Sequence, residues 1–535
     1  MIETNRLSNR SCSGQRVNHA LNGSAKIGCI IKERAYLFLV FAIALMLSPI
    51  VGHAQELAAT LTGSVTDTSG AVIPHASIKI TLNGVNGTAR VEESDGSGNY
   101  VASNLTAGTY SIIVTAPGFE TYQGKNIVLN VSEKHAFNAQ LKAGAVSTTV
   151  TVEDNPVSVD TETSAQSGTI SGEQVRELEI NSRNFEQLLT LQPGVVNQLG
   201  DEPNAGGIAM SVNGARLNAN NWTVDGADIN DSGSNATVVN QPSMEAIQEI
   251  TLQRGNYDAG FGRSGGGQIL VATRNGTSTF HGEGYEYVRT TDFDANDWLN
   301  KRSVYHQNVY GFVIGGPIYI PKAYNTDKKK TFFFWSEDWH KINQAGSSVV
   351  LTSPTTAAMT NGNWSAPSPG KDTNGNLLAP YIPQGPPGCV TSTVNPADNS
   401  SSGTVNVSMA GCVSQNAQLY IKDVFGPNTN AAGAVTINLP AQNNYRDDIV
   451  RIDHYFNDKV HFYARGLNDI MPVTEPMGLW AGNNYQNTAA ASVDSPGKNV
   501  VANLTYAISP KIVNEFEFVY AQGTYFSQFE ANQFA

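Results

Sequence analysis

Seven amphipathic segments in the second half of the chain constrain its fold most strongly. In 500–508, apolar side chains recur at every second position, and 308–320, 447–456 and 511–522 show similar alternation. Period-two alternation over about ten residues is typical of a strand that crosses a membrane, although strands of soluble sandwiches also alternate. The segments are 279–289, 308–320, 330–339, 447–456, 459–469, 498–508 and 511–522.

The connections between these segments alternate strictly between long and short. The long connections are 290–307, 340–446 and 470–497, and the short ones are 321–329, 457–458 and 509–510. Outer-membrane β-barrels have short turns on the periplasmic side and long loops outside the cell. The alternation therefore predicts an antiparallel transmembrane β-barrel, and it places the start of the preceding domains on the periplasmic side.

The first 54 residues are typical of a secretory signal peptide with a long N-terminal region. Lys32 and Arg34 precede an apolar run at 35–47, and small residues end at Ala54, where we expect cleavage. A retained anchor helix is the alternative, but Pro49 interrupts the apolar run too early to favour it. The net charge of −13 argues against a nucleic-acid partner, which needs cations along one surface.

Two cysteines remain after the expected cleavage site, Cys389 and Cys412, and both lie in one long polar loop. Because the chain is exported, we predict a disulfide bond between them. The sequence shows no ligand set for a metal and no catalytic constellation. We therefore predict neither an enzyme nor a bound cofactor.

Residues 57–142 contain about seven short strand-like runs separated by turn dipeptides such as Ser69-Gly70 and Asp95-Gly96. This pattern predicts a small β-sandwich. The stretches GSVTDTSGAVIPHASIKI (63–80) and SDGSGNYVASNLTAGTYSIIVTAPGFE (94–120) resemble the carboxypeptidase regulatory-like domain, whose fold is also called carbohydrate-binding-like.

Residues 143–160 form a linker with a short β-prone patch at Thr149, Val150, Thr151 and Val152. An alternating extended segment of this kind can add as a strand to the exposed sheet edge of a partner protein. An ordinary connector is an equally good interpretation of so short a motif.

The sequence of 161–275 combines helix signals with short strand-like runs, and this pattern predicts a mixed α/β domain. Ser171 and Gln174 form a capping-box pattern at the start of a helix, and 184–191 predicts a second short helix. From 210 to 274 the chain consists of short strands broken by Asn-Gly and Asp-Gly turns. The core positions that we expect in these strands are Ile247, Ile250, Leu252, Ile269 and Val271.

Four motifs carry a resemblance to the TonB-dependent outer-membrane receptors of the Oar-like type. They are NGARLNANNWTVDGADIND (213–231), QEITLQRGNYDAGFGRSGGGQILVATR (248–274), YGFVIGGPIYIPK (310–322) and RIDHYFNDKVHFYARG (451–466). The resemblance implies that 161–275 is a plug within the barrel and that the 149–152 patch is a TonB box. It also implies an outer-membrane location and a TonB-type energy-coupling protein as a partner.

The resemblance further implies active uptake of an extracellular substrate, possible classes being carbohydrate and peptide. Four charged residues are candidates for polar contacts between plug and barrel, with ordinary turn and surface charges as the alternative interpretation: Arg216, Asp225, Arg254 and Arg263. Two other functions stay open. One is a surface adhesion protein that uses the barrel as an anchor, and the other is a carbohydrate-binding module attached to a barrel.

The number of strands departs from the family. Barrels of these receptors have about 22 strands, whereas 276–535 supplies about seven. An open strand edge in lipid leaves backbone groups without hydrogen-bond partners. We therefore expect the sequence to be an N-terminal fragment, which makes the predicted fold a β-sandwich, a mixed plug and an incomplete antiparallel barrel.

Overall fold

The computed structural model describes residues 58–85, 89–144, 149–153, 163–197, 210–233, 235, 237–296, 304–345, 349–352, 362–366, 368–419, 434–437, 440–475, 491–509, 512–524 and 526–529. The predicted signal peptide at 1–54 lies outside these residues. Within them, no helix has both the length and the apolar character needed to span a membrane. The described chain is mainly β, as predicted.

The N-terminal domain is a β-sandwich of two sheets. One sheet has the order β4-β1-β7, with β8 also paired to β1, and the other has the order β3-β2-β5-β6-β9. Alternate residues of β1, β2 and β5 point into one apolar core, which includes Leu61, Ile78, Ile112 and Leu129. The strands are β1 (Ala59–Asp67), β2 (Ser77–Leu82), β3 (Ala89–Glu93), β4 (Asn99–Leu105), β5 (Gly108–Thr115), β6 (Thr121–Leu129), β7 (Lys134–Ala136), β8 (Ala139–Leu141) and β9 (Thr149–Glu153).

The fifth strand of the second sheet, β9, comes from the segment that the sequence marks as a linker. It runs parallel to β6, and Thr121 faces Thr149 while Lys125 faces Glu153. The candidate coupling patch is therefore a strand of the sandwich in this structure.

The plug is built on a five-stranded sheet of order β10-β15-β16-β13-β14. The predicted capping box forms, because the Ser171 side chain accepts from the Gln174 amide while the Gln174 side chain accepts from the Ser171 amide. The elements are β10 (Gln166–Ser171), α2 (Gly172–Glu177), η1 (Phe185–Leu191), β11 (Val195–Asn197), β12 (Met210–Val212), η2 (Leu217–Ala219), β13 (Asn221–Val224), β14 (Ala227–Asp228), η3 (Met244–Ala246), β15 (Ile247–Gly255) and β16 (Gln268–Thr273).

The plug core contains all five apolar residues predicted for it, each fully buried: Ile247, Ile250, Leu252, Ile269 and Val271. The same cluster continues into the barrel, since four barrel side chains belong to it: Val313, Phe334, Ile449 and Leu467. Plug and barrel therefore share one apolar core.

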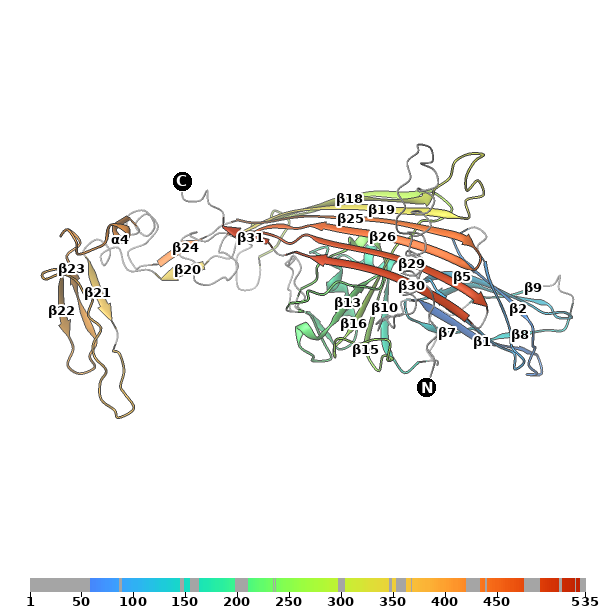
Figure 1. Ribbon diagram of the computed structural model, residues 1–535, viewed down its shortest axis with the longest axis horizontal. Coiled ribbons are helices and arrows are strands. Elements are labelled where there is room, and N and C mark those ends of the chain that lie inside the picture. Colours follow the sequence, from blue (N-terminus) through green and yellow to red (C-terminus); the bar gives the residue numbers. More distant parts are fainter. Residues whose placement is uncertain are drawn as a thin grey trace, which may run out of the picture. The chain divides into compact units, whose positions relative to one another are not determined.

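The barrel region is a single antiparallel sheet in which the seven long strands follow chain order (Figure 1). These strands are β17 (His281–Thr290), β18 (Tyr305–Pro317), β19 (Thr331–Ala345), β25 (Pro440–Asn457), β26 (Val460–Ile470), β29 (Gly497–Ser509) and β30 (Ile512–Gly523). Each overlaps one of the seven predicted segments. Three short strands extend the sheet beside β25: β27 (Pro472–Glu475), β28 (Ala491–Asp494) and β31 (Phe526–Phe529). Among the described residues β17 and β30 do not pair with each other, so the sheet is open.

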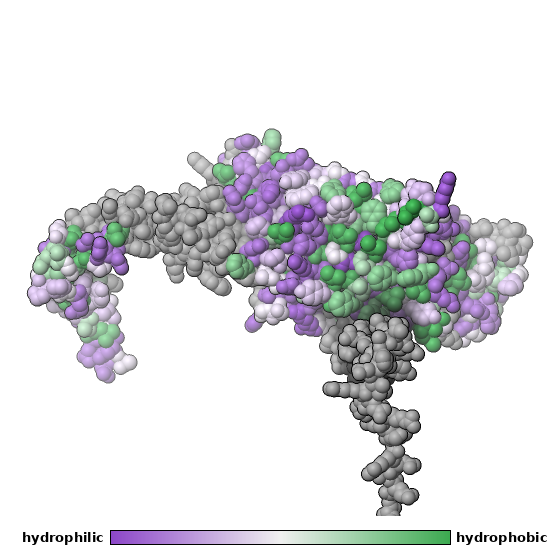
Figure 2. All heavy atoms as spheres, turned by 45° about the horizontal axis from the view of Figure 1, so that its top comes forward, coloured by the Kyte–Doolittle hydropathy of each residue, from purple (hydrophilic) through white to green (hydrophobic). Residues whose placement is uncertain are grey.

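The two faces of this sheet differ in polarity. Even-numbered residues of β25, β29 and β30 point outwards. In β29, in β30 and in 450–456 of β25 most of them are apolar, and Figure 2 shows hydrophobic side chains gathered over this outer face. Examples are Val450, Ile452, Val500, Leu504, Phe516 and Phe518. Odd-numbered residues of β25, β26 and β29 point towards the plug, and many are charged or amide side chains. This is the alternation expected of a barrel wall that faces lipid on one side and a filled lumen on the other.

The long connection after β19 contains its own small β-structure. Cys389 and Cys412 are joined by a disulfide bond in it. A three-stranded sheet of order β21-β23-β22 lies in the same part of the chain, and a pair of strands, β20 and β24, precedes and follows it in the sequence. The elements are β20 (Val349–Thr352), β21 (Asn363–Ala366), β22 (Val390–Val394), β23 (Ser401–Val405), α4 (Gln415–Leu419) and β24 (Ala434–Ile437).

Candidate functional site: the plug–wall interface

Asp225 stands at the tip of the β13–β14 hairpin, where the plug meets the wall. Asp225 and Gly226 both have positive φ, 46° and 84°, as a tight two-residue hairpin turn requires. The Asp225 carboxylate accepts hydrogen bonds from the Thr273 amide at 2.9 Å and the Thr273 hydroxyl at 2.7 Å. The turn and the next strand thus fix the direction in which this buried carboxylate points.

Two arginines of the wall converge on Asp225. The Arg465 Nε atom lies 2.9 Å from Asp225 Oδ2, and Arg465 Nη2 donates to the Val224 carbonyl at 2.7 Å. Arg451 Nη1 lies 3.8 Å from Asp225 Oδ1. Arg465 is 1% exposed and Arg451 is 4% exposed, so water does not screen these charges.

The arginines have further partners on the wall. Arg465 Nη1 donates to Asn499 Oδ1 at 2.6 Å, and Arg451 forms a bidentate pair with Asp453, at 3.0 Å for each hydrogen bond. Such planar pairing fixes both position and orientation of a guanidinium group. The wall therefore presents two preoriented cations to a single plug carboxylate.

A second contact has the opposite polarity. The wall carboxylates of Asp447 and Asp469 accept from backbone amides of the plug: Ser243 N–H donates to Asp447 Oδ1 at 3.2 Å, and Gln241 N–H donates to Asp469 Oδ2 at 2.7 Å. Both carboxylates are buried. A backbone N–H group is a good partner for a buried carboxylate. Its hydrogen bond stabilises the negative charge, and the N–H group carries no charge of its own.

The strand register explains why the wall needs the plug. Asp447 faces Asp469 across β25 and β26, and four residues further along Arg451 faces Arg465. Between them Ile449 faces Leu467. Like charges directly opposite each other destabilise a sheet. In this structure the plug supplies the anion between the arginines and the donors for the carboxylates.

A third polar cluster joins the plug to β17. Arg183 Nη2 lies 2.5 Å from Glu245 Oε1, the Arg183 guanidinium lies 3.9 Å from the centroid of the Tyr287 ring, and the Tyr287 hydroxyl donates to Glu245 at 3.1 Å. Burial raises the pKa of Glu245, and Arg183 acts against that rise. Nearby, the Tyr285 hydroxyl lies 3.3 Å from the Ser243 hydroxyl.

Of the four candidate contact residues, Asp225 alone reaches the wall through a contact that the structure shows. Arg254 donates to the Pro193 carbonyl at 2.9 Å, and Arg263 pairs with Asp228, so both bind within the plug. Arg216 is exposed and precedes the short helix η2.

The wall residues Arg451, Arg465, Asp447 and Asp469 were not among the sequence candidates. The signal that could have found them is the parity of their positions. Each is a charged residue at an odd-numbered position, and the outward-facing apolar residues Val450 and Ile452 of β25 stand at even-numbered ones.

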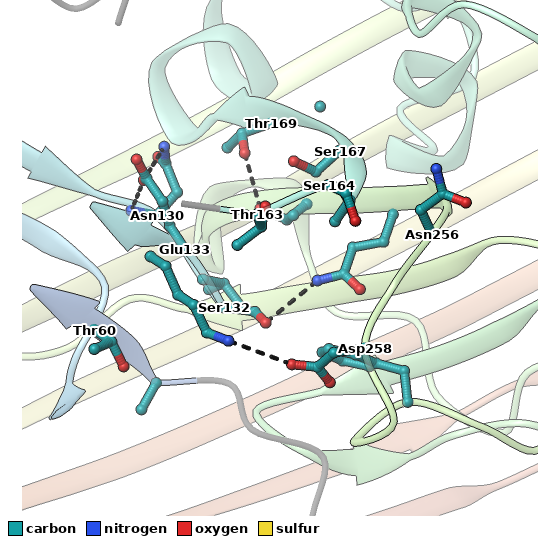
Figure 3. A pocket seen from close by; sticks show the side chains of 18 residues that line it. Thr60, Asn130, Ser132, Glu133, Thr163, Ser164, Ser167, Thr169, Asn256 and Asp258 are labelled. Carbon is teal, nitrogen blue, oxygen red and sulfur yellow. Dashed lines mark hydrogen bonds and ion pairs between the residues drawn. The ribbon is translucent and has the colours of Figure 1, made fainter. Parts of the chain in front are cut away.

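The junction between sandwich and plug is built differently (Figure 3). A cavity of about 590 Å³ lies there, and sandwich residues such as Thr60 and Asn130 line it together with plug residues such as Ser164 and Asn256. Lys134 Nζ lies 3.6 Å from Asp258 Oδ2, and both side chains are about half-exposed. Gln253 donates to the Ser132 hydroxyl at 3.3 Å. This junction is an open polar cleft crossed by few contacts.

One contact of the junction is buried. The Val131 amide, in the turn after β6, donates to the Glu249 carboxylate of β15. Burial raises the pKa of Glu249 to about 7, the hydrogen bond from Val131 opposes this rise, and the nearby Glu133 adds to it. Val131 also packs with Phe261 and Leu270 of the plug. Within the described residues, no group of three or more His, Cys, Asp or Glu side chains is arranged to hold a metal ion.

Comparisons with known families match this arrangement domain by domain. The Carboxypeptidase regulatory-like domain matches 60–142, the TonB-dependent Receptor Plug Domain matches 158–268, and the Outer membrane beta barrel domain matches 272–535. The chain belongs to the TonB-dependent outer-membrane receptors. Members of this family are transporters and not enzymes, and they reside in the outer membrane of Gram-negative bacteria; this receptor shares that location.

Among curated proteins, the receptor is 29% identical over 199 residues to the TonB-dependent transporter Oar of Myxococcus xanthus. The match covers 35% of this chain and spans 18% of the length of that relative. The outer membrane transporter YddB of Escherichia coli is 10% identical, with a TM-score of 0.35, over 64% of this chain and 36% of that one. The catechol 1,2 dioxygenase of Acinetobacter radioresistens is 16% identical, with a TM-score of 0.15, over 18% of this chain and 56% of that one.

Proposed function

We propose that this receptor takes up an extracellular substrate across the outer membrane, and that a TonB-type coupling protein drives uptake by pulling on residues 149–152. The observation that carries the proposal is the buried plug–wall cluster, in which Asp225 lies between Arg451 and Arg465. A plug held by a few oriented polar contacts has a defined resting position, and breaking those contacts releases it.

The order of the strands in the plug sheet connects the coupling segment to the cluster around Asp225. The next described residue after β9 is Thr163, and β10 begins at Gln166 as an outer strand of the plug sheet. Asp225 lies in the turn between β13 and β14, at the opposite edge of the same sheet. Force that enters at β10 therefore crosses β15 and β16 before it reaches the wall contacts.

The substrate class that we propose is carbohydrate or peptide, and the test is designed to distinguish the two. Cells that carry the complete native gene are given fluorescently labelled oligosaccharides and peptides in separate assays. Val150→Pro removes a backbone N–H that strand pairing with a coupling protein uses, while Thr151→Ala leaves the backbone unchanged. Surface level is measured with an antibody in each strain.

We expect Val150→Pro to reduce uptake of one substrate class more than tenfold and Thr151→Ala to leave it near the wild-type level. Cell attachment is measured in the same strains. If Val150→Pro leaves all uptake intact at normal surface level, coupled transport through this segment is refuted. Loss of attachment on deletion of the gene, with no effect on uptake, would instead support the adhesion function.

A further inference from the structure

We propose that the sandwich displays the coupling segment, so that a strand of the coupling protein adds to the free edge of β9 while β9 stays paired with β6. The inference rests on the proposed function, because it concerns the same segment, and it assigns a role to the N-terminal sandwich. The partner is a periplasmic protein that offers an extended strand.

The pairing of β9 leaves one of its edges open. All five of its residues face residues of β6, from Thr121↔Thr149 to Lys125↔Glu153. Among the described residues β9 pairs with β6 alone, and it is the last strand of its sheet. An outer strand presents a row of unpaired N–H and C=O groups, which is the template that strand addition uses.

Preorganisation is the physical benefit of this arrangement. A free five-residue segment must lose backbone entropy when it becomes a strand of a complex. In this receptor the pairing with β6 has already fixed the extended conformation. A partner strand therefore meets an ordered edge, and ordering a binding segment in advance increases affinity without any new contact.

The position of β9 in the chain connects this edge to the plug. The strand follows the sandwich strand β8 and precedes the plug strand β10. A partner attached to β9 is therefore attached to the sandwich and to the start of the plug at once. The short length of β9, five residues, is also a feature by which natural edge strands limit unspecific pairing.

The test uses the full chain in detergent-solubilised outer membrane and the purified periplasmic domain of the TonB-type protein from the same cell. Gln123 faces Thr151 in the β6–β9 register, so Gln123→Cys with Thr151→Cys pins β9 to the sandwich when oxidised. Facing strands lie about 4.8 Å apart, which suits a disulfide. The wild type under the same oxidant and reductant controls for the native Cys389–Cys412 bond.

A second variant weakens the pairing of β9 with β6, and a matched control leaves the backbone unchanged. Lys125 faces Glu153 of β9 and lies at an irregularity of the β5–β6 pairing, where no β5 partner is assigned to it. Lys125→Pro removes one N–H at that position, and Lys125→Ala is the matched control. Protease resistance of the sandwich shows that each variant is folded.

We expect the pinned receptor to bind the periplasmic domain at least as tightly as the reduced form, Lys125→Pro to bind at least tenfold more weakly, and Lys125→Ala to bind like the wild type. If oxidation abolishes binding and reduction restores it, β9 must leave the sandwich before it binds, and the proposal is overturned. Val150→Pro is tested in the same binding assay. If it binds the periplasmic domain like the wild type, residues 149–152 are not the coupling site, and the proposed function fails together with the inference.

Discussion

The plug has two interfaces of opposite construction, one with the wall and one with the sandwich. At the wall, Asp225 and two arginines form a buried network in which each charge has several partners. At the sandwich, a half-exposed ion pair and one buried carboxylate cross a polar cleft. Buried, multiply bonded charges resist separation more than exposed pairs do. We infer that a pull separates the sandwich from the plug before it moves the plug from the wall.

The largest expected effect is at the wall. Asp225→Ala leaves the buried Arg465 without a carboxylate partner, while Arg451 keeps its pair with Asp453, and breaking a buried pair costs about 3–5 kcal/mol. Hydrogen exchange of the Ser243 amide in the full chain measures the loss, because that plug amide donates to Asp447 of the wall and neither this substitution nor its control removes this acceptor.

The matched control for this change is Arg263→Ala. It removes an ion pair within the plug whose side chains are 38% and 40% exposed, so we expect a loss below about 1 kcal/mol. Equal effects of the two substitutions would show that burial does not distinguish the interfaces.

The next effect concerns pH at the junction. Burial raises the pKa of Glu249 to about 7, from 4.5 for a free glutamate, and the Val131 turn of the sandwich lies against this carboxylate. The docked state therefore binds more protons than the separated state between these values, and docking weakens as pH rises from 4.5 to 7. The difference is at most about 3 kcal/mol, the value for complete exposure of Glu249 on separation. This stabilisation of the docked state is fully present below pH 4.5 and is lost above pH 7.

Protection of the Val131 amide, corrected for intrinsic exchange, measures this dependence because that amide donates to Glu249. Protection should fall between pH 5 and pH 8 in the wild type. Glu249→Gln keeps an acceptor but cannot titrate, so its protection should stay level. The facing groups Glu133 and His135 remain in both proteins, and a fall of the same size in the variant would assign the dependence to them.

The smallest effect is expected at the exposed pair of the junction. Lys134→Ala removes the contact with Asp258 at side chains that are 44% and 57% exposed, which contributes at most about 1 kcal/mol. The contribution should disappear in high salt because exposed charges are screened. A larger, salt-independent loss would mean that Lys134 supports the junction by packing.

The strands were predictable because their signal is local. Alternation places apolar residues such as Val500 and Leu504 on the outer face, and a strand of this kind keeps its faces whatever its neighbours are. The helix that begins after Ser171 was equally accessible, since a capping box lies within four residues of sequence.

The contacts between elements were less accessible. Asp225 and Arg465 are 240 residues apart, and no local pattern connects them. The same limit applies to β9. Alternation at 149–152 indicates a strand, but any exposed edge accepts a strand, so the sequence did not indicate that this edge belongs to β6 of the same chain.

The paired like charges on the wall have a consequence for the space that the plug occupies. Arg451, Arg465, Asp447 and Asp469 keep their inward orientation because the strand register fixes it. Without the plug these groups would need hydration, so water must enter as the plug leaves. The vacated lumen would then be a water-filled channel lined by a pair of arginines and a pair of aspartates. Polar solutes would stay hydrated along it, and a dry apolar channel would not form.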